Sequence, residues 1–359
     1  MCAVSVMMLL SLVAQYVDDF PCVDIVAGAE TAQEALQLVL QVFGWDIEPT
    51  KRLPMAYQNI VLGVLVKLGN IASHLTAECE PVRAKINAVL QLLRDCKATG
   101  SMSSGQAASF RGKLNWICTP SYGHIGRAAC QAIYERQHDA NRFEWTDAMS
   151  HMLEFLEAIT APDVLPSLIV SMLPAKIWPV ILYTDASFHW LNGEPVAILG
   201  MYAKCTVTGE EFYSSMILPF WFYKFFSKDL ETYITQAELV AAIAAYYTIP
   251  DSLRRRAVIH FIDNTGACSA IVHGYARKPD CARLVNIYHA QAIGLRCMTW
   301  GEWVPSKANP ADIPTRVDRF GEMSKSAKWV VMVLPPIEEI EADPAAWISK
   351  VRAKEAAQK

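Results

Sequence analysis

The sequence predicts a mixed α/β (α+β) protein, on two observations. First, strand-like apolar runs alternate with helix-like patterns in residues 1–75 and again in residues 176–320, whereas residues 76–165 have a mostly helical pattern. Second, 53% of the 359 residues are hydrophobic and 19% are charged. That composition excludes a disordered chain, and the length suffices for two or three packed domains.

Turn and capping signals define the elements expected in the first region. Two apolar arms, Val4–Val17 and Phe20–Val26, flank a two-residue polar tip and predict a β-hairpin. A capping-box pattern predicts a helix that begins at Thr31 and ends at Gly44. A further strand is expected over Ile60–Val66.

The middle region is expected to be helical, with a linker after it. Pro81 suits the first position of a helix that runs to about Cys96. Ser104–Cys118 and Thr146–Ile159 are predicted as further helices. Three prolines punctuate the junction before residue 176, where we expect a linker: Pro162, Pro166 and Pro174.

Charge and cysteine content limit the class of protein. The net charge of −4 gives no global basic field for a nucleic-acid partner, although a local basic patch or bound metal ions can serve instead. The ten cysteines form no C-x-x-C pair, which disfavours a zinc ribbon and fits a reducing compartment. The apolar start, Met1–Ala14, lacks a basic leader and is too short to span a membrane. We therefore expect an intracellular protein, cytoplasmic or nuclear, neither secreted nor membrane-bound.

The strongest signal for chemistry is a set of lone acids in apolar segments of the third region. Asp185 ends the run Ile177–Thr184 and Asp263 ends the run Ala257–Ile262, and each is predicted to close a strand. Glu238 lies on a helix that is apolar almost all round, so it is expected to point into the fold. A buried carboxylate is costly unless it is paired, hydrogen-bonded or bound to metal.

A fourth acid extends this set and points to divalent cations. Asp312 follows the strand-like run Thr299–Val304. Four acids with no strong candidate for a general base point to a divalent metal. Oxygen ligands suit Mg²⁺ or Mn²⁺. The charge of two such ions would balance that of four carboxylates. Two metal ions side by side serve in-line phosphoryl displacement. The alternative is that each acid caps a helix or ends a strand at the surface. This explanation suffices for a single acid but fits poorly with three such acids in one stretch of about 80 residues.

Four segments around these acids resemble the motifs of a retroelement ribonuclease H: Tyr183–Ser187, Gln236–Leu239, Phe261–Asn264 and Val304–Asp312. The resemblance implies a mixed five-stranded sheet with flanking helices, two Mg²⁺ or Mn²⁺ ions, and cleavage of the RNA strand of RNA–DNA hybrids. Asp185 would bridge both ions, and Glu238 and Asp263 would each complete one ion's shell. Asp312 would hold the second ion more loosely.

Three further residues near this site are expected to contact nucleic acid. Asn264 and Thr265 are candidates for contacts to 2′-hydroxyl groups. Lys307 stands where the ribonuclease H family often has a histidine, shortly before the last aspartate, so altered turnover is expected.

The first region resembles the back half of a reverse transcriptase palm, and the middle region resembles the helical thumb and connection. The matching segments are Tyr16–Asp19 (metal-binding hairpin), Glu48–Lys51 (lysine-bearing motif), Asn59–Gly63 (primer-grip strands) and Phe110–Trp116 (connection). By this resemblance Asp18 and Asp19 would bind metal, and Lys51 would contact nucleic acid.

Together the motifs resemble a retrotransposon polyprotein fragment, of tyrosine-recombinase (DIRS-like) or Bel/Pao-like character. The expected domains are a truncated palm (1–75), a helical thumb and connection (76–165), a ribonuclease H-like domain (176–320) and a C-terminal tail (321–359). Because 15 residues precede Tyr16 in this sequence, we expect it to lack the upstream palm half with its metal-binding aspartate. We expect no polymerisation by this chain alone, and the missing polymerase segment is a candidate partner.

Several alternatives stay open at this point. The chain could be a catalytically inactive relic that binds nucleic acid or serves as a structural module. A DDE-type transposase is disfavoured because Glu238 precedes Asp263. The spacing of 53 between Asp185 and Glu238 indicates an insertion around Phe220–Phe226, whose aromatic side chains are expected to fill the core rather than stack on bases. Arg254–Arg256 is expected to be a solvated helix end rather than a phosphate site.

Overall fold

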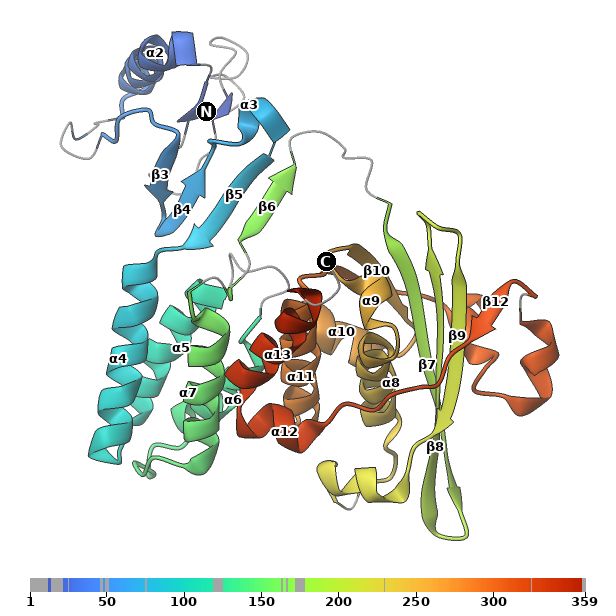
Figure 1. The fold of residues 1–359 in the computed structure, drawn as a ribbon. Helices are drawn as coiled ribbons and strands as arrows, with labels where there is room; N and C mark the ends of the chain where they lie inside the picture. Colours follow the sequence, from blue (N-terminus) through green and yellow to red (C-terminus); the bar gives the residue numbers. More distant parts are fainter. Residues whose placement is uncertain are drawn as a thin grey trace. The chain divides into compact units, whose positions relative to one another are not determined.

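The computed structural model describes residues 12–13, 22–24, 26–45, 48, 52–74, 76–118, 125–162, 164–165, 167–171, 178–228, 230–323 and 325–356. The chain divides into two compact units (Figure 1). Unit 1 comprises Met1–Val82 with Ile169–Leu173, and unit 2 comprises Arg83–Leu168 with Pro174–Lys359.

Unit 1 begins with a short strand pair and a helix. Strands β1 (Leu12–Val13) and β2 (Cys22–Val23) pair antiparallel, as predicted for the two hairpin arms, and the tip between them lies outside the described residues. Helix α2 (Ala29–Val42) follows the 3-10 turn η1 (Val26–Gly28). The predicted start at Thr31 is wrong, because η1 leads directly into the helix two residues earlier and leaves Thr31 in its first turn.

A four-stranded sheet forms the rest of unit 1. Its strands, in spatial order, are β3 (Gln58–Val61), β4 (Val64–Lys67), β5 (Thr76–Pro81) and β6 (Leu168–Ser171), with the short helix α3 (Ile71–His74) between β4 and β5. The single strand predicted over Ile60–Val66 is wrong. Leu62 (φ +51°) and Gly63 (φ +80°) form a two-residue turn, so the segment folds back into an antiparallel hairpin.

The same sheet corrects two further expectations. Pro81 ends strand β5, so it does not start the helix that follows, which begins at Arg83. The junction predicted as a linker contains strand β6. Strand β6 is an apolar Leu-Ile-Val-Ser segment whose β-branched residues favour a strand.

Unit 2 opens with four helices: α4 (Arg83–Thr99), α5 (Ser104–Cys118), α6 (Gln131–Gln137, preceded by η4, Ala128–Cys130) and α7 (Asp147–Thr160). Helix α5 has the predicted bounds. Helix α7 begins after Thr146, whose side-chain oxygen accepts a hydrogen bond from the Met149 backbone N–H at 3.3 Å.

A six-stranded mixed sheet is the centre of unit 2. Its strands, in spatial order, are β11 (Met298–Trp303), β10 (Ala257–Ile262), β7 (Val180–Leu191), β8 (Glu194–Cys205), β9 (Glu211–Ile217) and β12 (Ala327–Trp329). Strands β7, β8 and β9 run antiparallel, whereas β10 is parallel to both β7 and β11. The predicted mixed α/β class is confirmed. The sheet has six strands instead of five because β12, from the tail, adds alongside β9.

Further helices follow in unit 2: α8 (Ile234–Thr248), α9 (Pro250–Leu253), α10 (Thr265–His273), α11 (Pro279–Leu295), α12 (Ile337–Ala342) and α13 (Pro344–Ala356). Helices α8 and α10 pack on the sheet, and α11 packs on α8. Helix α8 is buried from Gln236 to Tyr246, as its uniformly apolar sequence predicts. The aromatic segment η5 (Phe220–Phe225) places Phe222 and Phe225 in the core, as expected. Phe220 and Trp221 are 68% and 55% exposed, so the core-filling interpretation is wrong for these two residues.

The tail belongs to unit 2. Ile337, Ile340 and Ile348 are each 1% exposed, and α13 packs against α11 and α7. Arg254, expected at a solvated helix end, instead donates from Nη1 to the Val351 carbonyl oxygen at 3.0 Å. One continuous core therefore joins the early helices, the sheet and the tail. Within the described residues, no helix combines the length and apolar character needed to cross a membrane.

Candidate metal centre

Asp185 lies inside strand β7, where it pairs with Gly200 of β8. The prediction that Asp185 ends its strand is wrong, because the β7–β8 pairing continues for six more residues, to Leu191 opposite Glu194. Asp185 is 5% exposed, and the Thr315 hydroxyl lies 2.8 Å from its Oδ2. The carboxylate is therefore held between the sheet and the segment that carries Thr315.

Gly200 allows that segment to approach the sheet. A Cβ atom at position 200 would lie 2.6 Å from the Ala311 carbonyl oxygen and 2.7 Å from Thr315 Cγ2, both closer than van der Waals contact. Asn309 fastens the same segment, because its Nδ2 donates to the Thr184 carbonyl oxygen at 3.0 Å and its Oδ1 accepts from the Ala311 N–H at 3.1 Å. The chain around residues 309–315 is thus tied to strand β7 at the position of Asp185.

Glu238 reaches the same place from the second turn of helix α8. It is 3% exposed, and its Oε2 has no hydrogen-bond partner among the described residues. Burial raises its pKa well above the usual range, and the charges of Asp185 and Asp263 raise it further. The prediction that Glu238 points into the fold is confirmed.

Asp263 directly follows strand β10, as predicted. The Trp303 indole N–H donates to the Asp263 carbonyl oxygen at 2.9 Å and so ties the end of β10 to the end of β11. The next residue, Asn264, caps helix α10 by accepting the Ala267 N–H at 2.9 Å. The sharp change from strand to capped helix leaves Asp263 at the edge of the site, half-buried.

These three acids converge on one point. One carboxylate oxygen from each of Asp185, Glu238 and Asp263 lies within 4.8 Å of the others. Burial raises the pKa of Asp185 to about 7, and the charges of Asp263 and Asp312 add to this, against the hydrogen bond from Thr315. Three crowded oxygen donors, one without a partner among the described residues, fit a hard divalent cation such as Mg²⁺ or Mn²⁺.

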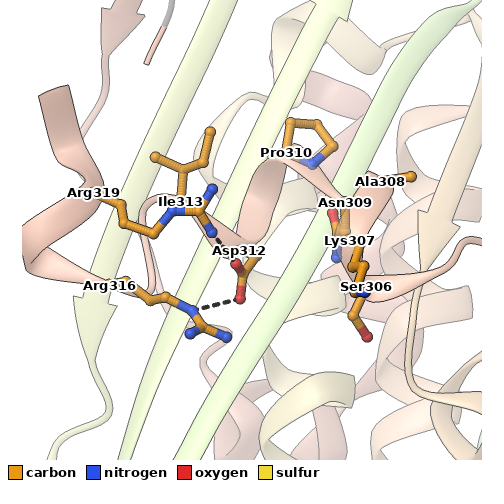
Figure 2. Close-up of a pocket in the computed structure, with 9 residues that line it drawn as sticks. All are labelled: Ser306, Lys307, Ala308, Asn309, Pro310, Asp312, Ile313, Arg316 and Arg319. Carbon is orange, nitrogen blue, oxygen red and sulfur yellow. Dashed lines mark hydrogen bonds and ion pairs between the residues drawn. The ribbon is translucent and has the colours of Figure 1, made fainter. Parts of the chain in front are cut away.

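Asp312 is not one of the three clustered acids. It ends the 3-10 turn η7 (Pro310–Asp312), and its carboxylate pairs with two arginines (Figure 2). Arg316 Nε lies 2.8 Å from Oδ1, and Arg319 Nη1 lies 2.5 Å from Oδ2. Asp312 therefore stands beside the cluster with its charge already compensated, and its role as a metal ligand stays a prediction.

The other expected site residues lie apart from this cluster or outside the described part of the chain. Asp18, Asp19 and Lys51 belong to segments outside the described residues. Thr265 is exposed at the start of α10, and Lys307 is exposed in the 3-10 turn η6 (Ser306–Ala308). Their contacts to nucleic acid, like those of the capping residue Asn264, stay predictions.

Sequence reasoning missed the residues that position the acids. Gly200 carries a usable signal, since a glycine inside a strand pattern marks a close approach of another backbone. Thr315, Arg316 and Arg319 follow Asp312 closely in the chain, but nothing in their order shows which carboxylate each one contacts.

No protein-family model and no curated protein matches the sequence. Solved structures similar to the chain include the foamy viral protease-reverse transcriptase in complex with an RNA/DNA hybrid, at 11% identity and a TM-score of 0.38. They also include the foamy viral protease-reverse transcriptase dRH in complex with double-stranded DNA, at 12% identity and a TM-score of 0.39. Each alignment covers 86% of this chain but only 37% and 48% of the respective viral chain, so this chain spans less than half of either. The site is therefore interpreted from its own geometry.

Proposed function

We propose that the chain is a divalent-metal-dependent nuclease that cuts the RNA strand of RNA–DNA hybrids. The observation that carries this proposal is the convergence of Asp185, Glu238 and Asp263, from three separate elements, within 4.8 Å in a largely buried site. Burying three carboxylates without a cation is costly, so such a cluster is a candidate for function.

The three acids would hold Mg²⁺ or Mn²⁺. Such ions lower the pKa of bound water and stabilise charge on phosphoryl oxygens. The chain's own contribution is to orient the ligands, since Thr315 lies against one oxygen of Asp185 and Glu238 keeps one oxygen without a protein partner among the described residues. Because the ligands must be deprotonated, metal binding would release a proton from Asp185, whose pKa is about 7.

The hybrid substrate and the second ion rest on the motif resemblance. The order of the four acidic motifs is that of a retroelement ribonuclease H, and the first region adds palm-like motifs. We infer that Asp312 serves the second ion, for which its carboxylate would have to exchange Arg316 and Arg319 for the cation.

A cleavage assay with the full chain tests this function. The substrate is an RNA–DNA hybrid labelled on the RNA strand, with duplex DNA and single-stranded RNA in parallel, in Mg²⁺ or Mn²⁺. Wild type should cut the hybrid and leave duplex DNA intact. Asp263→Asn should lower the rate by several orders of magnitude, at about 1.4 kcal/mol of barrier per tenfold. Asp139→Asn, at an exposed ion pair with Arg142, is the matched control. A folded wild type that leaves the hybrid uncut with both metals contradicts the proposal.

One observation favours a second candidate, an inactive module that binds nucleic acid. The two arginines on Asp312 compensate the charge of the expected fourth ligand. If this pairing persists on the substrate, the chain would bind the hybrid without cutting it, and the same assay with a binding measurement separates the two functions.

A further inference from the structure

A polar pocket opens beside the three clustered acids. It has a volume of about 520 Å³, and its lining includes Lys307, Asn309, Asp312, Arg316 and Arg319 (Figure 2). The Thr315 hydroxyl connects the pocket to the cluster, because it lies 2.9 Å from the Asp312 carbonyl oxygen and 2.8 Å from Asp185 Oδ2. The pocket therefore adjoins the segment that holds Asp185 in place.

The two arginines of the pocket differ in how many N–H donors remain free to bind a ligand. Arg319 is engaged on both sides: Nη1 contacts Asp312, and Nε and Nη2 contact Glu322 at 2.9 and 2.8 Å. Arg316 uses only Nε, on Asp312, and its side chain is 58% exposed. Among the described residues, its Nη1 and Nη2 have no hydrogen-bond partner.

Lys307 supplies a second available cation. It is exposed, and its ammonium group has no ion-pair partner among the described residues. In Figure 2 it lies across the pocket from Arg316. The lining holds three cations, Lys307, Arg316 and Arg319, and one acid, Asp312; outside the lining, Glu322 and Asp318 act on Arg319. The pocket therefore offers an anion the free donors of Arg316 and Lys307.

We propose that Arg316 and Lys307 bind a backbone phosphodiester of the nucleic-acid strand beside the reacting phosphate. This rests on the proposed function and names the contact that places the strand against Asp185. The Nη fork of an arginine matches two phosphate oxygens, and a lysine adds a point charge. While no ion is bound at Asp312, Asp312 and Arg319 act as positioning residues, because the Asp312 carboxylate holds Arg316 by Nε and Arg319 holds that carboxylate from the other side. An ion on Asp312 would displace this contact.

The test measures binding of the full chain to a fluorescent RNA–DNA hybrid by anisotropy, in EDTA so that nothing is cut, over a series of NaCl concentrations. Arg316→Gln should weaken binding by about tenfold and lower the slope of log K against log[salt] by about one, because one phosphate contact is lost. Lys307→Gln should lower the same slope, and the double variant should lower it by no more than about one, since both donors serve one phosphate. Circular dichroism checks that each variant is folded.

Two variants sharpen the result. Arg142→Gln removes an exposed arginine, 69% exposed and paired with Asp139, that does not line the pocket, so binding and slope should match wild type. Arg316→Lys keeps the charge but removes the fork, so the slope should persist while affinity falls.

At constant ionic strength, inorganic phosphate should compete with the hybrid no better than chloride does. Displacement of the hybrid by low phosphate from wild type but not from Arg316→Gln would reassign the pocket to a free phosphate and overturn the proposal.

An Arg316→Gln variant with the affinity and slope of wild type overturns the proposal, and so does a wild type that does not bind the hybrid. Cleavage is measured separately, so the two conclusions can fail independently. Cleavage with an unaltered slope in Arg316→Gln removes only the phosphate site. A reduced slope in that variant, with no cleavage by wild type, keeps the phosphate site and removes the nuclease.

Discussion

When metal is absent, Asp185→Asn should destabilise the folded chain at acid pH and stabilise it at neutral pH. Asp185 has a folded-state pKa of about 7 against an ordinary value of 3.8. The folded chain thus holds a proton there that the unfolded chain releases. The contribution of this proton to the free energy of unfolding is therefore fully present below about pH 4, and it is lost as the pH rises towards 7. Asparagine does not titrate, so the variant lacks this loss.

The size of the effect follows from the same values. Each pKa unit corresponds to about 1.4 kcal/mol, so a difference of about three between the folded and unfolded states changes the free energy of unfolding by about 4 kcal/mol. Against this, the asparagine brings an amide N–H into the buried site, and an amide that finds no acceptor there costs about 1–3 kcal/mol. The variant should be about 1–3 kcal/mol less stable than wild type at pH 4 and about 1–3 kcal/mol more stable at pH 8.

Urea denaturation followed by circular dichroism, in EDTA at pH 4, 6 and 8, measures this reversal. Asp251→Asn, at a side chain 66% exposed, is the control and should follow wild type at every pH. Adding Mg²⁺ at pH 8 should stabilise wild type by about 2.7 kcal/mol at a hundredfold excess over Kd, and Asp185→Asn combined with Asp263→Asn should abolish that gain. A variant that is less stable than wild type by the same amount at pH 4 and pH 8 would refute the reasoning.

Three further changes test the surroundings of the site and the turn in unit 1. Gly200→Ala should lower the free energy of unfolding by about 1–3 kcal/mol and weaken the response to Mg²⁺, because its Cβ would meet the Ala311 carbonyl oxygen at 2.6 Å; equal stability in urea would contradict this. Thr315→Val should raise the pKa of Asp185 further, so half-maximal Mg²⁺ binding, followed by calorimetry between pH 6 and 8, should move to higher pH. Leu62→Asn should stabilise unit 1 by roughly 0.5–1 kcal/mol, measured by hydrogen exchange of β3 and β4, because asparagine tolerates the positive φ better than leucine.

The sequence determined the parts of this protein that depend on local pattern. Helix α5 and strand β10 were predictable because the period of the apolar residues sets which face is buried, and helix α8 because a helix that is apolar almost all round must be buried. Asp185, Glu238 and Asp263 were identifiable as partners, because each is a lone charge in an apolar segment and needs compensation once buried.

Contacts between distant segments were decided only by the tertiary structure. Strand β7 passes through Asp185 because β8 pairs beyond it, and the reversal at Leu62 depends on the pairing of β3 with β4. The tail's place in the core depends on α13 meeting α11 and α7. The pairing of Asp312 with Arg316 and Arg319 is local in the chain, yet it too needed the structure: the order of residues shows which charges are present, but their interaction energy depends on the distances between them, and only the folded chain sets those distances.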